Sequence, residues 1–419
     1  MTTTKTWKDA QNILCIRLDS LGDVLMTTPA IRAIKESCSG RRITLLTSKS
    51  GEAIASAVPE IDQIIVYDAP WLKATSPRQN SQPEFEMIEQ LRCLKFDGVV
   101  IFTVFSQNPL PSALLCYLAD IPLRLAHCRE NPYLMLTDWV LESEPHQGIR
   151  HEVRRQLDLV SNIGCKTDSE CLSLQVPQLA QDRVVQLLKK MGIDTAQPWV
   201  VIHPGATAIS RRYPPESFAS VTRQLVLDGF GVVFTGTQPE QQLIESIQQA
   251  VGVPTHSLVA MLDLEELAAI IAIAPLLISN NTGPVHIACA VGTPVIDLYA
   301  LTNPQHTPWG VPHRVLFHDV SCKFCYKSIC PEKHHNCLRL VTPQSVVAAV
   351  YELYNEVIGK DRGAEGTREQ EDKGTREQGD KGRITVSFPP FPSHPLTPSS
   401  SSPQPLRQSP SLSAKEIWQ

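Results

Sequence analysis

The sequence predicts an α/β protein made of two halves, each a parallel β-sheet with helices packed on it. Short apolar runs alternate along the chain with stretches of helical spacing, and each run ends in a turn rich in Gly, Asn, Thr or Pro. This alternation is typical of parallel sheets, whose strands are joined by crossover helices. The pattern loosens once, around 176–198, and then begins again. We therefore expect one domain over 12–180 and a second over 197–355.

The first half begins with the apolar run NILCIRL at 12–18, which predicts a strand, and the turn DSLGD follows. A helical pattern comes next, with Thr28 and Pro29 predicted as its N-cap and first-turn proline. Further strands are predicted at 43–47, 64–67 and 98–102.

The second half begins with a strand in WVVIHPG at 199–205, and a helical spacing follows at 215–227. Asp263 and Glu266 have the spacing of a capping box before a helix at 267–274. The other elements predicted here are strands at 231–235, 276–279 and 294–299 and a short helix near 285–291. Open α/β sheets bind ligands beyond the carboxyl ends of their strands. We therefore expect the site in these turns, in a cleft between the two halves.

The composition disfavours two classes of protein. Among 419 residues, 38 Lys and Arg stand against 43 Asp and Glu, so the chain lacks the basic field that nucleic acids require. The longest nearly unbroken apolar run, 267–278, is too short to span a bilayer, which takes about 20 residues. The first residues, MTTTKTWKDAQ, lack the apolar core of a secretory signal. We expect a cytoplasmic protein with no nucleic-acid partner.

The end of the chain has a different composition. The segment GTREQEDK at 366–373 is nearly repeated as GTREQGDK at 374–381, and Pro and Ser dominate from Ser387 onward. Such a segment cannot bury enough apolar surface to offset the entropy of ordering. We predict a disordered tail over 360–419.

The turn after the first strand carries the first candidate site residues. Gly22 permits a tight backbone path, and Asp23 follows it at a helix entrance. The Asp23 carboxylate suits either of two roles. It can cap the helix, or it can accept a proton from a substrate hydroxyl.

Two turns of the second half suit a nucleotide. The turn at His203 offers backbone N–H groups, and Arg211 and Arg212 add fixed positive charge, which together suit a diphosphate. The alternative is a solvated loop with two surface arginines. In the turn TGTQPE at 235–240, Glu240 can either cap the next helix or accept hydrogen bonds from ribose hydroxyls.

The stretch SNNTGPVH at 279–286 is the most informative. Thr282 and Gly283 stand at a predicted helix N-terminus, where backbone N–H groups favour an anion. His286 lies one turn further and can reach the same anion, although a histidine on a helix is more often structural.

Taken together, these stretches resemble the heptosyltransferases of glycosyltransferase family nine. The resemblance covers roughly residues 12–355 and rests on four motifs in order. They are SLGDVLMTTPAIRAIK at 20–35, HPGA with RRYPPESFA at 203–219, TGTQPE at 235–240 and SNNTGPVHIACAVGTPVIDLY at 279–299. The resemblance implies the GT-B fold, in which two Rossmann-like, doubly wound domains face a cleft.

The resemblance also implies an activity. Family members transfer a heptose from ADP-heptose to the inner core of lipopolysaccharide with inversion, and they need no metal or other cofactor. Asp23, in the acceptor-side domain, is then the general base. The substrate-binding residues would be Gly22 in the first domain and, in the nucleotide-sugar-binding second domain, His203, Arg211, Arg212, Glu240, Asn281, Thr282, Gly283 and His286. A lipid-linked acceptor implies peripheral contact with the cytoplasmic membrane face.

Asn281 departs from the family pattern, since many members carry Asp at this position. An amide keeps the capacity to form hydrogen bonds and loses the charge. Two rival functions are therefore considered beside transfer. One is a sugar-nucleotide epimerase or hydrolase of the same fold, and the other is a non-catalytic nucleotide-sugar or metal-binding protein.

Four of the twelve cysteines are clustered, with the spacing Cys322-x2-Cys325-x4-Cys330-x6-Cys337. Four thiols close together in a reducing compartment suggest a structural zinc site. The alternative is a loop of reduced thiols or of one or two opportunistic disulfides. The cluster is not expected to take part in transfer.

Overall fold

The structure of the protein, a computed structural model, describes residues 6–72 and 75–371. In this part of the chain the strands form two six-stranded sheets, in which every pairing is parallel. The first sheet contains β1 (Asn12–Arg17), β2 (Arg42–Thr47), β3 (Gln63–Val66), β4 (Gly98–Ile101), β5 (Leu123–Cys128) and β6 (Asp138–Leu141). The second contains β7 (Trp199–His203), β8 (Gly231–Phe234), β9 (His256–Ser257), β10 (Leu277–Asn280), β11 (Val295–Leu298) and β12 (His313–Leu316).

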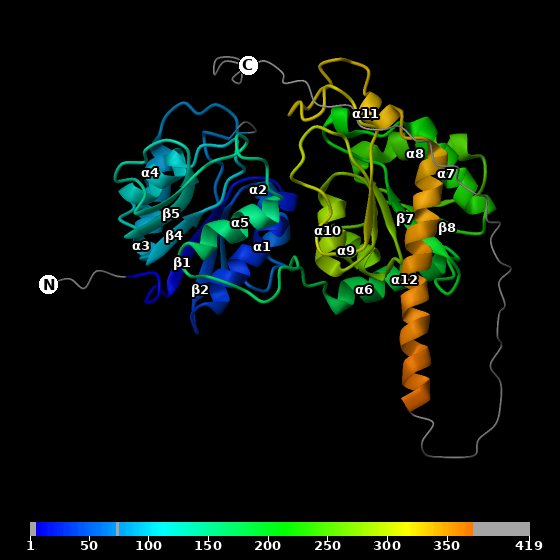
Figure 1. Ribbon diagram of the computed structural model, residues 1–419, viewed down its shortest axis with the longest axis horizontal. Helices are drawn as coiled ribbons and strands as arrows, with labels where there is room; N and C mark the ends of the chain where they lie inside the picture. The colour runs from blue at the N-terminus through cyan, green and yellow to red at the C-terminus, as the bar shows by residue number, and fades with distance from the viewer. Residues whose placement is uncertain (1–5, 73–74, 372–419) are drawn as a thin grey trace. The chain divides into compact units, whose positions relative to one another are not determined.

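Helices connect the strands of both sheets (Figure 1). Those of the first half are α1 (Leu21–Glu36), α2 (Lys49–Ala55), α3 (Gln82–Leu94), α4 (Leu110–Leu118) and α5 (Glu152–Ser161). Those of the second half are α6 (Gln178–Lys190), α7 (Pro215–Leu227), α8 (Gln241–Val251), α9 (Leu264–Ile273), α10 (Gly283–Val291), α11 (Asn336–Arg339) and α12 (Pro343–Glu371). Two short 3₁₀ helices, η1 (Ile209–Arg211) and η2 (Gln238–Glu240), lie in the turns after β7 and β8.

The first sheet is covered by helices on both faces, because alternate side chains of its buried strands point to opposite sides. Ile13 and Cys15 of β1 share a core with α1, α2 and α5. Leu14 and Ile16 share another core with α3 and α4. The strand order is β3-β2-β1-β4-β5-β6, so the direction of winding reverses between β1 and β4.

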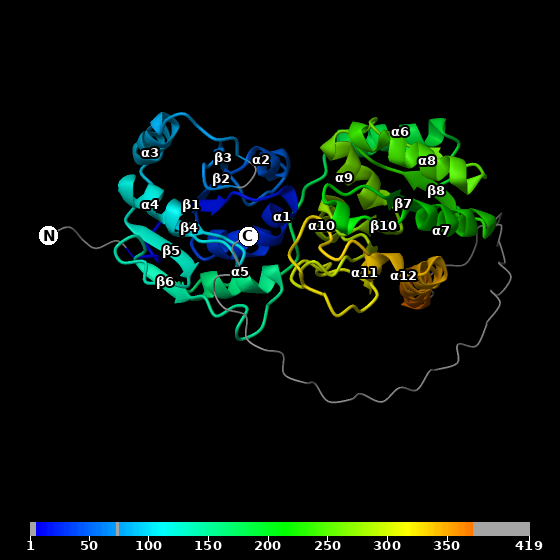
Figure 2. The same ribbon diagram turned by 90° about the horizontal axis from the view of Figure 1, so that it is seen from above.

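The second sheet repeats this plan with the order β12-β11-β10-β7-β8-β9, and its winding reverses between β7 and β10. Helices α6, α9 and α10 pack on one face, beside Val201. Helices α7, α8 and α12 pack on the other, beside Ile202, and Figure 2 shows α12 next to α7 from a second side. Ligands of such sheets bind at the reversal point. The candidate residues after β1, β7 and β10 all lie at these two points.

The structure confirms the predicted fold class of doubly wound parallel sheets, and each strand predicted from an apolar run is present. The capping box of α9 is also present, with Asp263 and Glu266 each accepting from the other's backbone N–H. The sequence analysis did not place strands β5, β6, β9 and β12 or helices α2, α3, α4, α5, α6, α11 and α12. Helix α6 falls within the segment where the pattern loosens, and it packs on α9.

The predicted start of the first helix is wrong. Helix α1 begins at Leu21 with Ser20 as its N-cap, so Pro29 lies inside the helix. A proline cannot donate the backbone hydrogen bond to the carbonyl four residues earlier, which here belongs to Leu25. The Thr28 hydroxyl donates to the Leu25 carbonyl instead, at 2.7 Å. This replacement explains how the helix tolerates the proline.

The C-terminal part of the chain is described only as far as Glu371, the last residue of α12. The helix therefore continues past Lys360, where the sequence predicts the tail to begin. The rest of the predicted tail, 372–419, lies outside the described residues. Among the helices of the described ranges, none is both long and apolar enough to cross a membrane.

Candidate active site

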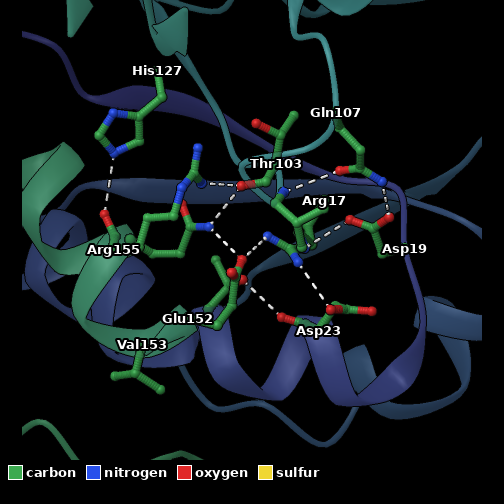
Figure 3. A network of polar contacts seen from close by, with 12 residues as sticks. Arg17, Asp19, Asp23, Thr103, Gln107, His127, Glu152, Val153 and Arg155 are labelled. Carbon is green, nitrogen blue, oxygen red and sulfur yellow. Dashed lines mark hydrogen bonds and ion pairs between the residues drawn. The ribbon is translucent and has the colours of Figure 1, made fainter. Parts of the chain in front are cut away.

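Arg17, at the end of β1, is the centre of a buried network of charges (Figure 3). Its guanidinium is 3.0 Å from Asp19, 3.0 Å from Asp23 and 2.8 Å from Glu152, and its side chain is fully buried. Glu152 comes from the first turn of α5 and also accepts a hydrogen bond from Gln156 at 2.6 Å. One cation thus holds three carboxylates from two distant parts of the chain. The turn DSLGD predicted where this cluster lies, but the sequence analysis did not single out Arg17 as its cation.

The surroundings of Asp23 are compatible with both roles that the sequence left open, helix cap and proton acceptor. Its Oδ2 accepts hydrogen bonds from the Ser20 backbone N–H and hydroxyl, so it completes the capping box of α1. Its Oδ1 accepts from Arg17 at 3.0 Å. Burial by itself raises the pKa of Asp23, but Arg17, His306 and the Ser20 hydrogen bonds lower it to about 2. The carboxylate is therefore ionised throughout the physiological range, as a proton acceptor must be.

Asp19 is a second carboxylate in the same turn, and the sequence prediction did not single it out. Gln107 donates to its Oδ1, and Arg17 lies against its Oδ2. Burial and the neighbouring Asp23 raise its pKa to about 6, even though Arg17 acts in the opposite direction. A carboxylate in this range is also suited to proton transfer. Asp19 is therefore the alternative base.

The N-termini of α1 and α10 lie against each other. A Cβ on Gly22 would come within 2.6 Å of the His286 ring, and a Cβ on Gly283 within 3.0 Å of Leu21. His286 is buried, and burial lowers the pKa of its imidazole to about 3, so it is neutral. Thr282 is the N-cap of α10. The structure thus brings Gly22, Asp23, Gly283 and His286 together. The sequence analysis expected a site built from these turns.

The two arginines that the sequence predicts for the site, Arg211 and Arg212, interact with different parts of the protein. Arg212 donates to the Ala206 carbonyl at 2.8 Å and so holds the turn after β7. The Arg211 charge lowers the pKa values of His286 and His306, which places its guanidinium within electrostatic reach of both rings. Of the two arginines, Arg211 is thus the one whose charge acts on a histidine of α10.

His203 and Glu240 form a second group, beside a pocket. His203 is buried, with its Nδ1 3.1 Å from the Thr235 hydroxyl and its Nε2 4.0 Å from the Glu240 carboxylate. Glu240 accepts from the Thr237 N–H at 2.7 Å and so completes a capping box of its own. A Cβ on Gly205 would lie 1.8 Å from the same carboxylate, so a larger residue there would displace the Glu240 side chain. The adjoining pocket is lined by His203, Thr235, Gly236, Thr237, Leu262, Asp263, Leu264 and Leu267.

Asn280, which the sequence prediction passed over, ties the turn after β7 to β10. Its Nδ2 donates to the Pro204 carbonyl at 2.7 Å, and its Oδ1 accepts from the Tyr213 N–H at 2.9 Å. The next residue, Asn281, also bonds within the protein. Its Nδ2 donates to Asp297 and to the His306 carbonyl, both at 2.9 Å. An aspartate at 281 could not donate either bond. The asparagine that departs from the family pattern is thus matched by two hydrogen bonds that require an amide donor.

Three of the clustered cysteines lie between β12 and the short helix α11, and Cys337 lies in α11 itself. All four thiols are free, and Cys322 Sγ lies 3.7 Å from His334 Nε2. Across 6–72 and 75–371, no group of three or more His, Cys, Asp or Glu side chains is arranged to hold a metal ion. The four thiols are therefore not gathered into a zinc site here.

Two doubly wound parallel sheets, each with candidate site residues in the turns at its reversal point, are the architecture of the GT-B type of glycosyltransferase. A solved glycosyltransferase family 9 protein from Veillonella parvula has a TM-score of 0.68 at 19% identity, covering 83% of this chain and 97% of that one. The Escherichia coli structure named ADP-heptose lps heptosyltransferase II has a TM-score of 0.63 at 21% identity, with 82% and 99% coverage.

Sequence comparison identifies the family. The model of glycosyltransferase family 9 (heptosyltransferase) matches residues 85–336, and the chain belongs to this family. A relative named lipopolysaccharide heptosyltransferase 3, from Escherichia coli, is 28% identical over 294 residues, which is 69% of this chain and 82% of the relative.

Proposed function

We propose that this enzyme transfers a heptose from ADP-heptose to a saccharide of the lipopolysaccharide core, with inversion at the anomeric carbon. The observation that carries the proposal is the contact between Gly22 and His286, which sets a candidate base beside a candidate diphosphate site. The relatives supply the substrate class, because they are named as lipopolysaccharide and ADP-heptose heptosyltransferases.

The donor would bind to the second half. The pocket beside His203 and Glu240 has apolar walls for a base and polar groups for a ribose, which suits the nucleoside. The diphosphate would lie at the N-terminus of α10, where Thr282 and Gly283 present backbone N–H groups. Arg211 would add positive charge as the C–O bond to the diphosphate breaks.

The acceptor hydroxyl would approach from the first half. Its oxygen attacks the anomeric carbon on the face opposite the departing ADP, and its proton passes to the Asp23 carboxylate. Arg17 and the Ser20 hydrogen bonds hold that carboxylate in one orientation. The acceptor is lipid-linked in this proposal, so we place the enzyme in the cytoplasm, in peripheral contact with the membrane.

The test is ADP release from ADP-heptose, with and without a core saccharide that lacks its heptose. Release that depends on the acceptor supports transfer. Release without the acceptor identifies a hydrolase, and no release with retained ADP-heptose binding identifies a binding protein. Either of the last two results contradicts the proposal.

A further inference from the structure

The loop after β11 contains a histidine that none of the sequence motifs marked. His306 lies within electrostatic reach of Asp23 and Glu152 in the first half and of Arg211 in the second, since their charges act on the pKa of its imidazole. Burial lowers the pKa of this imidazole, against the opposing effect of Asp23 and Glu152. Charged groups of both halves therefore act on this histidine.

The backbone on both sides of His306 is held by hydrogen bonds to three successive carbonyls. The Gln305 carbonyl accepts from the Glu152 N–H at 3.0 Å, and the His306 carbonyl accepts from Asn281 at 2.9 Å. The Thr307 carbonyl lies 2.8 Å from His151 Nε2. Two of these bonds come from the start of α5 and one from the end of β10. The loop is therefore anchored to both halves of the enzyme.

The His151 tautomer fits this anchoring. Its Nδ1 accepts from the Val153 N–H at 3.2 Å, so its proton is on Nε2 and points to the Thr307 carbonyl. The His151 ring also stacks on Trp309, with the ring centroids 4.5 Å apart. These contacts restrict the loop on each side of His306, which fixes where the His306 side chain can lie.

The His306 side chain itself has an unused polar atom. Its Nε2 is buried, and no described residue forms a hydrogen bond with it. A buried ring nitrogen without a partner is uncommon, because the loss of hydration is then uncompensated. The anchored loop holds this nitrogen in place, which is typical of a group that meets a ligand.

We propose that His306 contacts the transferred sugar of the donor, with Nε2 hydrogen-bonded to one of its hydroxyl groups. The inference rests on the proposed function. In an inverting transfer the sugar must lie between the base and the departing diphosphate. The loop that carries His306 is bonded both to Glu152, which contacts Arg17 beside Asp23, and to Asn281, which directly precedes the N-cap of α10. Asn281 is then a positioning residue, which acts by holding the loop that carries His306.

The test compares two ligands, ADP-heptose and ADP, by calorimetry without acceptor. His306→Ala should weaken the binding of ADP-heptose by about 3- to 10-fold, the effect of one lost neutral hydrogen bond. The binding of ADP should not change, because ADP lacks the sugar. His306→Gln keeps a polar group at this position and should recover part of the affinity. His318→Gln, on an exposed histidine of the same half, is the matched control.

Equal weakening for both ligands would show that His306 contacts the nucleotide, and unchanged affinity for both would show that it contacts neither. Either result overturns the inference. The His306 comparison needs only donor binding, so a parent protein that binds ADP-heptose without transferring it contradicts the proposed function alone. A parent that does not bind ADP-heptose contradicts both.

Discussion

At the residue scale, Arg17 gives two neighbouring carboxylates different properties. Both Asp19 and Asp23 contact its guanidinium. Asp23 also accepts two hydrogen bonds from Ser20, which favour its ionised form, and its pKa is lowered to about 2. Asp19 lies among more carboxylates than cations, and its pKa is raised to about 6. The two groups can therefore be separated by their pH dependence.

With Asp23 as the base, kcat/KM for transfer should not fall as the pH is lowered from 8 to 5, because its carboxylate stays ionised. Asp23→Asn should slow transfer by a factor of about 10²–10⁴ while ADP-heptose still binds. Asp19→Asn, the matched control, should keep most of the rate. A loss of rate centred near pH 6 that disappears in Asp19→Asn would instead identify Asp19 as the base.

Asp297 should make stability depend on pH. It is fully buried, and burial raises its pKa from 3.8 to about 8 despite the hydrogen bond from Asn281. The folded state therefore keeps a proton that the unfolded state loses at lower pH. The contribution of Asp297 to stability is present below pH 4 and is lost as the pH rises through 8.

Asp297→Asn removes this titration, and its amide oxygen can still accept from Asn281. From pH 5 to pH 8 the Tm of the parent should fall relative to that of the variant. Above pH 8 the difference between the two should stay constant. Thermal unfolding at several pH values measures it. A difference that is the same at every pH would show that Asp297 does not retain its proton in the folded state.

At the scale of elements, helix α1 depends on Thr28. The Thr28 hydroxyl donates to the Leu25 carbonyl at 2.7 Å and accepts from the Ser173 N–H at 2.9 Å. Thr28 is buried, so water cannot replace either bond. One residue thus compensates for Pro29 and also attaches the segment before α6 to the helix.

Thr28→Val keeps the shape of the side chain and removes both hydrogen bonds. We expect a loss of roughly 2 kcal/mol in the free energy of unfolding, because two buried polar groups lose their partner. Thr28→Ser keeps the hydroxyl and should cost less. Urea unfolding gives the comparison. A Thr28→Val variant as stable as the parent would show that the two hydrogen bonds do not stabilise the fold.

At the scale of the whole molecule, Gly22 governs how closely α1 of the first half meets α10 of the second. A methyl group on Gly22 would come within 2.6 Å of the His286 Cδ2 atom, and His286 is buried and cannot easily move away. Since alanine normally stabilises a helix relative to glycine, any destabilisation here must come from this contact.

Gly22→Ala should lower stability by about 1–3 kcal/mol, the usual cost of overpacking a core. His286→Ala makes room for the methyl group, so the double variant should be less destabilised than the sum of the two single variants. A double-mutant cycle from urea unfolding measures this coupling. Strict additivity would mean that the two helices do not meet at this point in solution.

The amino-acid sequence was sufficient for features that depend on near neighbours. The apolar runs of β1, β2, β3, β4, β7, β8, β10 and β11 predict strands because burial on both faces requires continuous apolar residues. The same local spacing predicts the capping box at Asp263. The short strand β6 escaped notice because its side chains alternate between exposed and half-buried, which leaves no continuous apolar run. The placement of the motifs at strand ends also follows from the sequence, since each turn is adjacent to its strand.

The contacts that make the site chemically specific came only from the tertiary structure. Arg17 and Glu152 are separated by 135 positions in the chain, yet they lie 2.8 Å apart in the core. The loop that carries His306 is likewise held by the start of α5 and the end of β10, which are far apart in the chain. Such contacts leave no periodic pattern in a sequence, because they depend on where distant elements are brought together by packing. The pKa values of Asp19 and Asp23 differ for the same reason, since each is set by neighbours that the fold supplies.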